Sequence, residues 1–122
     1  CAAINNHEPG NKCRKIILNI AEDKIKAVTS VITWDEVVYS IWKKEGKEKA
    51  LREGELFLQI PNLLLLDSNL DIISKAQELI EIYGLKPRDA IHAATAITNK
   101  IKKIASDDTD FDRIKELKRL KI

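Results

Sequence analysis

Near its C-terminus the chain reads Lys103-Ile104-Ala105-Ser106-Asp107-Asp108-Thr109-Asp110-Phe111-Asp112, a short strand pattern followed directly by four carboxylates within six residues. In open sheets of parallel strands, ligand sites lie beyond the carboxyl ends of the strands. The same residues also fit a solvated turn, because aspartates commonly cap the helix that follows. The segment therefore predicts either an acidic site at a sheet edge or an ordinary helix cap.

Outward from this segment, turn formers and apolar periodicity divide the chain into alternating strands and helices. Strands are expected at residues 26–30, 63–66 and 103–106, and helices at residues 12–22, 34–45, 50–57, 70–83, 87–99 and 111–117, with a loop at residues 5–11. The strands are short and apolar enough to be covered on both faces. This alternation predicts an α/β fold with a parallel sheet flanked by helices.

Length and composition indicate one cytoplasmic domain spanning residues 1–122. The 122 residues are 44% apolar, which suffices for one core. The longest apolar block, residues 63–66, is far shorter than the ~20 residues that span a bilayer, so no membrane association is expected. Two cysteines are too few for a disulfide framework, which favours a reducing compartment. A net charge of +2 excludes no class of partner.

A second acid, Asp89, falls in the first turn of the helix that begins at Pro87. An acid there stabilises a helix by ~0.3–1 kcal/mol through the macrodipole, so Asp89 alone would not indicate a site. However, this helix is rich in alanine and apolar on nearly every side, which predicts close packing against the sheet. A carboxylate at its start would be held rigidly and would face the same sheet edge as the aspartates after residue 106.

Glu36 is a third candidate, in the first turn of the helix after the strand at residues 26–30. Its alternative role is a capping box with Thr33, three residues earlier. Asp35 points about 100° away around the helix, so only one of the two acids would enter a shared site.

If Glu36, Asp89 and Asp108 converge, a bound cation would relieve their mutual repulsion. Ligands that offer only oxygen select hard cations such as Mg²⁺ or Mn²⁺, which also accept substrate phosphate. Such a metal polarises the phosphoryl oxygen and activates a bound water, so that no side-chain nucleophile is needed.

Other metal sites fit the sequence poorly. A calcium loop starting at Asp108 would place Arg113 where glycine is needed and Arg119 where a bidentate glutamate is needed. His92 is expected to be a packed helix residue outside the metal set. The potential zinc ligands have no short paired spacing: Cys1, His7, Cys13 and His92.

Two groups of basic residues offer contacts to a polynucleotide backbone. Interspersed glutamates make ordinary solvated helix faces the simpler interpretation. The groups are Lys43, Lys44, Lys47, Lys49 and Arg52, and then Lys115, Lys118, Arg119 and Lys121.

The order of the acids resembles the PIN domain, especially the prokaryotic VapC-like toxins. The resemblance rests on Thr29-Ser30 followed by Glu36, on the Arg-Asp-Ala-x-x-x-Ala pattern that begins at Arg88, and on the Ser-x-Asp-x-Asp-Phe pattern that begins at Ser106. It implies a three-layer α/β/α sandwich with a central parallel sheet and a Mg²⁺- or Mn²⁺-dependent endoribonuclease. It also implies a homodimer that acts on RNA as the toxin of a type II pair and is neutralised by a cognate antitoxin.

By motif position, the resemblance makes Glu36, Asp89 and Asp108 the catalytic and metal-binding acids. Asp110 would be auxiliary, and the Ser106 hydroxyl would help to position a metal-bound water. Family members begin with a strand that carries another Asp, whereas this sequence starts at Cys1, so the domain is expected to be N-terminally incomplete. Two alternatives remain open: a catalytically silent PIN-like module that binds RNA or protein, and a signalling domain with a phosphoacceptor Asp.

Overall fold

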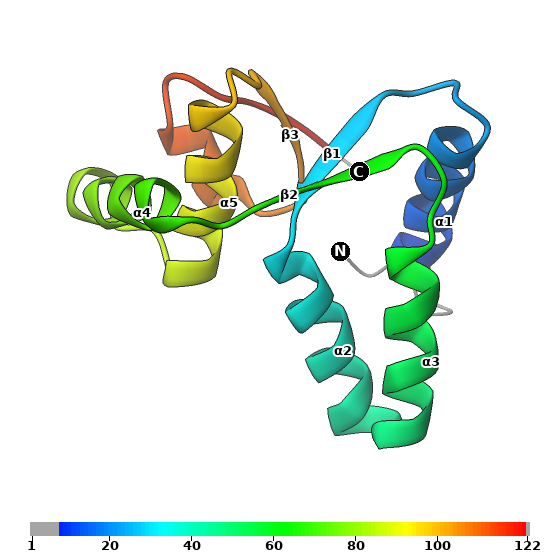
Figure 1. Ribbon diagram of the computed structural model, residues 1–122. Helices are drawn as coiled ribbons and strands as arrows, with labels where there is room; N and C mark the ends of the chain where they lie inside the picture. The colour runs from blue at the N-terminus through cyan, green and yellow to red at the C-terminus, as the bar shows by residue number, and fades with distance from the viewer. Residues whose placement is uncertain (1–7, 122) are drawn as a thin grey trace. The chain divides into compact units, whose positions relative to one another are not determined.

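The computed structural model describes residues 8–121, with side chains from residue 15 onward (Figure 1). The chain divides into two compact units, with the boundary in the sequence between Leu65 and Leu66. Cys1 and His7, named above as potential zinc ligands, and the side chain of Cys13 lie outside the described part. Within residues 8–121, every helix is too short or too polar to cross a membrane.

The first unit combines three helices with a two-stranded sheet. In chain order, its elements are α1 (Glu8–Ala21), β1 (Ala27–Ser30), α2 (Ile32–Glu45), α3 (Lys47–Leu58) and β2 (Leu63–Leu66), the last residue of which belongs to the second unit. The strands β1 and β2 are hydrogen-bonded neighbours. The helices α2 and α3 pack side by side as a hairpin around Val38, Ile41 and Ala50 (Figure 1). Gly46 joins them at φ 88°, a backbone conformation that favours glycine.

The start of the first helix differs from the prediction. The prediction of a loop at residues 5–11 is wrong for residues 8–11, because α1 begins at Glu8. Pro9 is compatible with this start, since the N–H groups of a first helical turn have no partner within the helix.

The predicted capping box of Thr33 and Glu36 is also wrong. The helix α2 begins at Ile32, and its N-cap residue Val31 makes no side-chain capping bond. Instead, the Ile32 N–H donates to the Ser30 hydroxyl over 3.2 Å. The Thr33 hydroxyl lies 2.8 Å from that of Thr29. The two hydroxyls at the end of β1 therefore organise the entry into α2.

The second unit contains the elements α4 (Leu70–Tyr83), α5 (Pro87–Thr98), β3 (Lys103–Ala105), the 3₁₀ helix η1 (Thr109–Arg113) and β4 (Lys118–Leu120). The strands β3 and β4 pair in parallel, with Ile104 opposite Arg119. The predicted mixed α/β architecture with parallel strands is confirmed.

The ends of α4 and α5 follow the local sequence rules. The Asn69 side chain accepts a 3.0 Å hydrogen bond from the Ile72 N–H and so caps α4. Gly84 ends that helix in the left-handed conformation. Pro87 occupies the first turn of α5, as predicted. These signals place the start of α5, and with it Asp89, at a defined point of the chain.

The core of the second unit forms between α4, α5 and the C-terminal segment. As predicted from its alanine content, α5 is closely packed: Ala90, Ala93 and Ala94 are fully buried. Leu79 of α4 and Ile114 after η1 are the largest fully buried side chains of the described residues. Small side chains on α5 allow neighbouring elements to approach its backbone closely.

The helix predicted for residues 111–117 is replaced by η1 and an unpredicted strand, β4. Phe111, Ile114 and Leu117 are all buried, a spacing of three that resembles one face of an α-helix. In the structure, the Ile114 N–H donates to the Phe111 carbonyl and the Leu117 N–H to the Ile114 carbonyl. These are bonds across three residues, which explains a period of three without an α-helix.

Gly54 of α3 marks a close approach within the helical hairpin. A Cβ atom at this position would lie 2.7 Å from Cγ2 of Val38 and 2.9 Å from Nε1 of Trp34. Overpacking of this kind costs ~1–3 kcal/mol, whereas the helix propensity of alanine returns ~1 kcal/mol. We expect Gly54→Ala to lower the free energy of unfolding by about 1 kcal/mol, measured by denaturant titration.

A double-mutant cycle with Val38→Ala controls this prediction, because that change removes the nearer atom. In the Val38→Ala background, Gly54→Ala should cost less or become stabilising. Stabilisation by Gly54→Ala in the otherwise unchanged protein would contradict the close packing of α2 and α3.

Candidate metal centre

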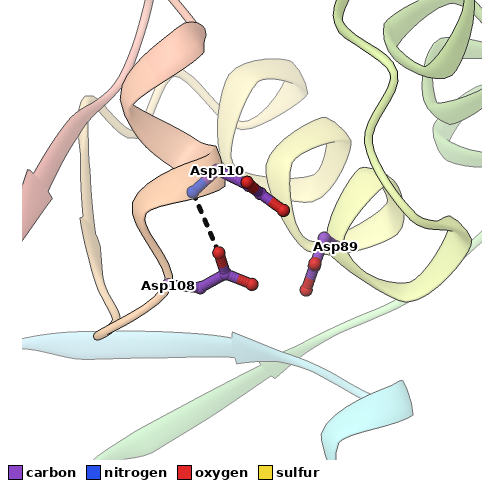
Figure 2. Close-up of side chains that lie close together, drawn as sticks. All are labelled: Asp89, Asp108 and Asp110. Atoms are coloured by element: carbon purple, nitrogen blue, oxygen red, sulfur yellow. Dashed lines mark hydrogen bonds between the residues drawn. The ribbon is translucent and has the colours of Figure 1, made fainter.

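Three carboxylates of the second unit converge on one point. Asp89, Asp108 and Asp110 each offer an oxygen atom, and these atoms all lie within 4.8 Å of one another. Figure 2 shows the three side chains directed toward one another, Asp89 from α5 and the two others from the segment after β3. The structure thus brings together two acids named from the sequence, Asp89 and Asp108, and one named as auxiliary, Asp110.

Asp89 is placed by the packing of α5. It lies two residues after Pro87 in the first turn, half-buried, and the next residue, Ala90, is completely buried. The backbone at the start of the helix therefore has little freedom to move. A partly buried carboxylate interacts more strongly with a nearby cation than an exposed one, because less water screens its charge.

Asp108 is placed by hydrogen bonds within its own loop. Its N–H donates to the Ser106 hydroxyl over 3.0 Å. Its Oδ1 accepts a 2.9 Å bond from the Asp110 N–H and so caps η1. Figure 2 shows the second carboxylate oxygen of Asp108 on the side that faces Asp89. The predicted helix cap is therefore present, because Asp108 caps η1, and the same residue is a member of the carboxylate cluster.

Asp110 forms an ion pair with an arginine of the same 3₁₀ helix. Nη2 of Arg113 lies 3.1 Å from Oδ1 of Asp110. Nη1 of the same guanidinium donates to the Tyr83 carbonyl over 3.2 Å. Phe111, only 3% exposed, anchors η1 in the core between the two charged residues. Part of the negative charge of Asp110 is therefore balanced within the protein.

A second arginine holds the end of the same loop. Nε and Nη2 of Arg119 donate to Oδ1 and Oδ2 of Asp112 over 2.9 and 3.3 Å. Nη1 donates to the Ser106 carbonyl over 3.0 Å. The hydrogen bond with Asp112 raises the pKa of Arg119, so the guanidinium is charged at every pH of ordinary assays. Sequence reasoning did not anticipate this contact, because seven residues separate the partners.

The remaining candidates lie as follows. Ser106 is half-buried, and its hydroxyl and carbonyl accept the two bonds described above. His92 is half-buried on α5 and is not part of the carboxylate cluster. Glu36 is half-buried on α2, in the first unit. Its predicted role as a metal ligand and that of Ser106 in positioning water stay predictions.

The cluster fits a hard divalent cation by its chemistry. Its donors are carboxylate oxygens only, which suit Mg²⁺ or Mn²⁺ and not zinc. Opposite ligands of an octahedral Mg²⁺ lie about 4 Å apart. Adjacent ligands lie about 2.9 Å apart, and at most one pair among three ligands can be opposite. The three oxygen atoms, within 4.8 Å of one another, would therefore have to move closer together to bind one ion.

This chain has a mixed α/β fold with parallel strands, and its carboxylate cluster follows one of those strands. These features define a class of small α/β proteins that carry acidic residues at the edge of the sheet. The model of the family described as PIN domain matches residues 1–117. The chain therefore belongs to the PIN domain family, and the resemblance noted in the sequence is confirmed.

One relative of known sequence is named as a ribonuclease. Ribonuclease VapC2 of Methanocaldococcus jannaschii is 40% identical over 84 residues, which are 69% of this chain and 56% of that protein. The match thus spans little more than half the length of this relative.

Two solved structures share the fold. The crystal structure of VapBC2 from Rickettsia felis bound to a DNA fragment from their promoter is 23% identical and has a TM-score of 0.72, covering 98% of this chain and 89% of that chain. A toxin–antitoxin complex from Klebsiella pneumoniae is 26% identical with a TM-score of 0.54, covering 72% of this chain and 68% of that chain. The first comparison confirms the PIN-like fold.

Proposed function

We propose that this protein is a metal-dependent endoribonuclease and the toxin of a type II toxin–antitoxin pair. The convergence of Asp89, Asp108 and Asp110 in a chain of the PIN domain family carries this proposal. The name of the relative from Methanocaldococcus jannaschii, a ribonuclease, gives it independent support.

The metal would be Mg²⁺ or Mn²⁺, held by Asp89 and Asp108 together with Glu36, and with Asp110 as an auxiliary ligand. When bound, such an ion polarises a phosphoryl oxygen and lowers the pKa of a bound water. The carboxylates supply the negative charge that retains the cation beside an anionic substrate. No serine, cysteine or lysine is then required as a nucleophile, and RNA phosphodiesters are the substrate class.

The loop after β3 would present its ligands with little rearrangement. Asp108 uses one oxygen to cap η1, which leaves the orientation of its second oxygen restrained by the same bond. Asp110 shares its charge with Arg113, which suits an auxiliary role better than that of a principal ligand. A preorganised set of oxygen ligands lowers the cost of binding the ion.

A cognate antitoxin and a second copy of the chain are the proposed protein partners. The hairpin of α2 and α3 exposes large apolar side chains, including Trp42 at 49% exposure, whereas Phe57 is half-buried. Exposed apolar residues of this kind commonly mark protein interfaces. The solved relative from Klebsiella pneumoniae is a toxin–antitoxin complex, which supports an antitoxin as a partner.

The test is cleavage of a mixed structured RNA by purified protein in Mn²⁺ or Mg²⁺. We expect fragments with either ion, no fragments after chelation by EDTA, and recovery when Mn²⁺ is added back in excess. Asp89→Asn keeps the side-chain size but removes the charge. In Mn²⁺, this variant should fail to cleave RNA, as the unaltered protein does after chelation by EDTA. Cleavage that survives chelation would contradict a metal mechanism. RNA binding without cleavage in either ion would favour the catalytically silent module.

A further inference from the structure

Arg119 occupies an inward-facing position on a strand that is otherwise exposed. Its side chain is 16% exposed, whereas Lys118 and Leu120 on either side of it are exposed. Its register partner on β3, Ile104, is likewise less exposed than its own neighbours. Because side chains alternate between the two faces of a strand, Arg119 and Ile104 share the inner face of this small sheet. A guanidinium there needs hydrogen-bond acceptors close by.

Those acceptors lie at both ends of the acidic loop. The Ser106 carbonyl, at the start of residues 106–112, accepts from Nη1. The two carboxylate oxygens of Asp112, at the end of this loop, accept from Nε and Nη2. A backbone bond from the Ser106 N–H to the Leu120 carbonyl adds a further tie to β4. One side chain therefore joins the two ends of the loop that carries Asp108 and Asp110.

We propose that Arg119, paired with Asp112, is a positioning residue that holds the loop 106–112 so that Asp108 and Asp110 lie beside Asp89. As far as it concerns metal binding, this inference rests on the proposed function. The planar guanidinium donates three bonds in fixed directions, two to one carboxylate and one to a carbonyl. A lysine ammonium carries the same charge but cannot reproduce this fork.

The experiment measures Mn²⁺ affinity of the full chain by the signal of free Mn²⁺ in electron paramagnetic resonance, well below the unfolding temperature. Loss of groups that orient metal ligands lowers metal affinity about 10- to 100-fold. We expect a loss of this size for Arg119→Gln and for Asp112→Asn, and a smaller one for Arg119→Lys. The double variant should bind Mn²⁺ with about the same affinity as the weaker-binding single variant, because each single change already breaks the pair of Arg119 and Asp112.

Amide hydrogen exchange supplies a second measurement that requires no metal. The Asp110 N–H donates to Asp108 within the loop, and its protection should fall in Arg119→Gln. Lys118→Gln is the matched control, since it changes a neighbouring charge on the exposed face of β4, and it should alter neither measurement.

The outcomes separate this inference from the proposed function. Unchanged Asp110 protection in Arg119→Gln would overturn the positioning role, whether or not the protein binds metal. Unchanged Mn²⁺ affinity in a variant that is merely less stable would also overturn it, since Arg119 would then serve stability alone. Failure of the unaltered protein to bind Mn²⁺, with protection still lost in Arg119→Gln, would instead contradict the metal-dependent function and leave the loop role standing.

Discussion

On the proposed function, Asp108→Asn should reduce metal-dependent RNA cleavage by about 10²- to 10³-fold, because it would remove a ligand charge worth several kcal/mol to the metal-bound transition state. The asparagine oxygen can still accept the bond from the Asp110 N–H, so the cap of η1 and the loop conformation should remain. The measurement is the single-turnover rate of RNA cleavage at saturating Mn²⁺, together with the Mn²⁺ concentration that gives half of the maximal rate.

Asp107→Asn provides a matched control for this change. Asp107 is the neighbouring residue and carries the same charge, but it is exposed and is not a member of the carboxylate cluster. Its replacement should change the cleavage rate less than about threefold, which corresponds to a surface effect within ~0.5 kcal/mol. Equal losses in both variants would show that the total charge of the loop matters and that Asp108 has no particular role.

Leu79→Ala should be the most destabilising of the changes considered. Leu79 is 1% exposed and packs in the core formed by α4, α5 and the C-terminal segment. Truncating a buried leucine costs ~2–5 kcal/mol, from lost burial and from the cavity left behind. We expect the midpoint of thermal unfolding, followed by circular dichroism, to fall by roughly 10 °C.

Leu70→Ala on the same helix is the control, because this leucine is 78% exposed. Its replacement should change the free energy of unfolding by less than ~0.5 kcal/mol. A similar loss in both variants would contradict the burial assigned to the inner face of α4.

Leu79 lies in the core and is not a cluster acid. Added Mn²⁺ should therefore raise the midpoint of thermal unfolding of Leu79→Ala by about as much as it raises that of the unaltered protein.

Three of the four carboxylates in the acidic loop have partners or neighbours of two different kinds. Asp110 and Asp112 each face an arginine, Arg113 and Arg119 respectively. Asp108 instead accepts a backbone bond and faces Asp89. This division explains how several carboxylates can follow one another so closely: ion pairs reduce the repulsion at the end of the loop, and a cation would reduce it at the cluster.

The parts of the fold that the sequence predicted well are those specified by neighbouring residues. The apolar run at Leu63–Leu66 is a strand, and Asn69 and Gly84 delimit α4 as caps. Pro87 and the alanines of α5 indicated a closely packed helix with Asp89 in its first turn. Each of these signals acts within about four residues, so no tertiary contact is needed to recognise it.

The sequence by itself determined the family and the order of strands and helices in most of the chain. It also named Asp89 and Asp108 as candidate site residues, with Asp110 as an auxiliary, whereas their convergence is a feature of the tertiary structure. Only the tertiary structure decided that β4 is a strand, because its polar residues gain their extended conformation from pairing with β3. It alone also paired Arg119 with Asp112 and Ser106. Such contacts depend on how close the folded backbone brings residues that are distant in the chain. Local sequence patterns do not determine this spatial separation.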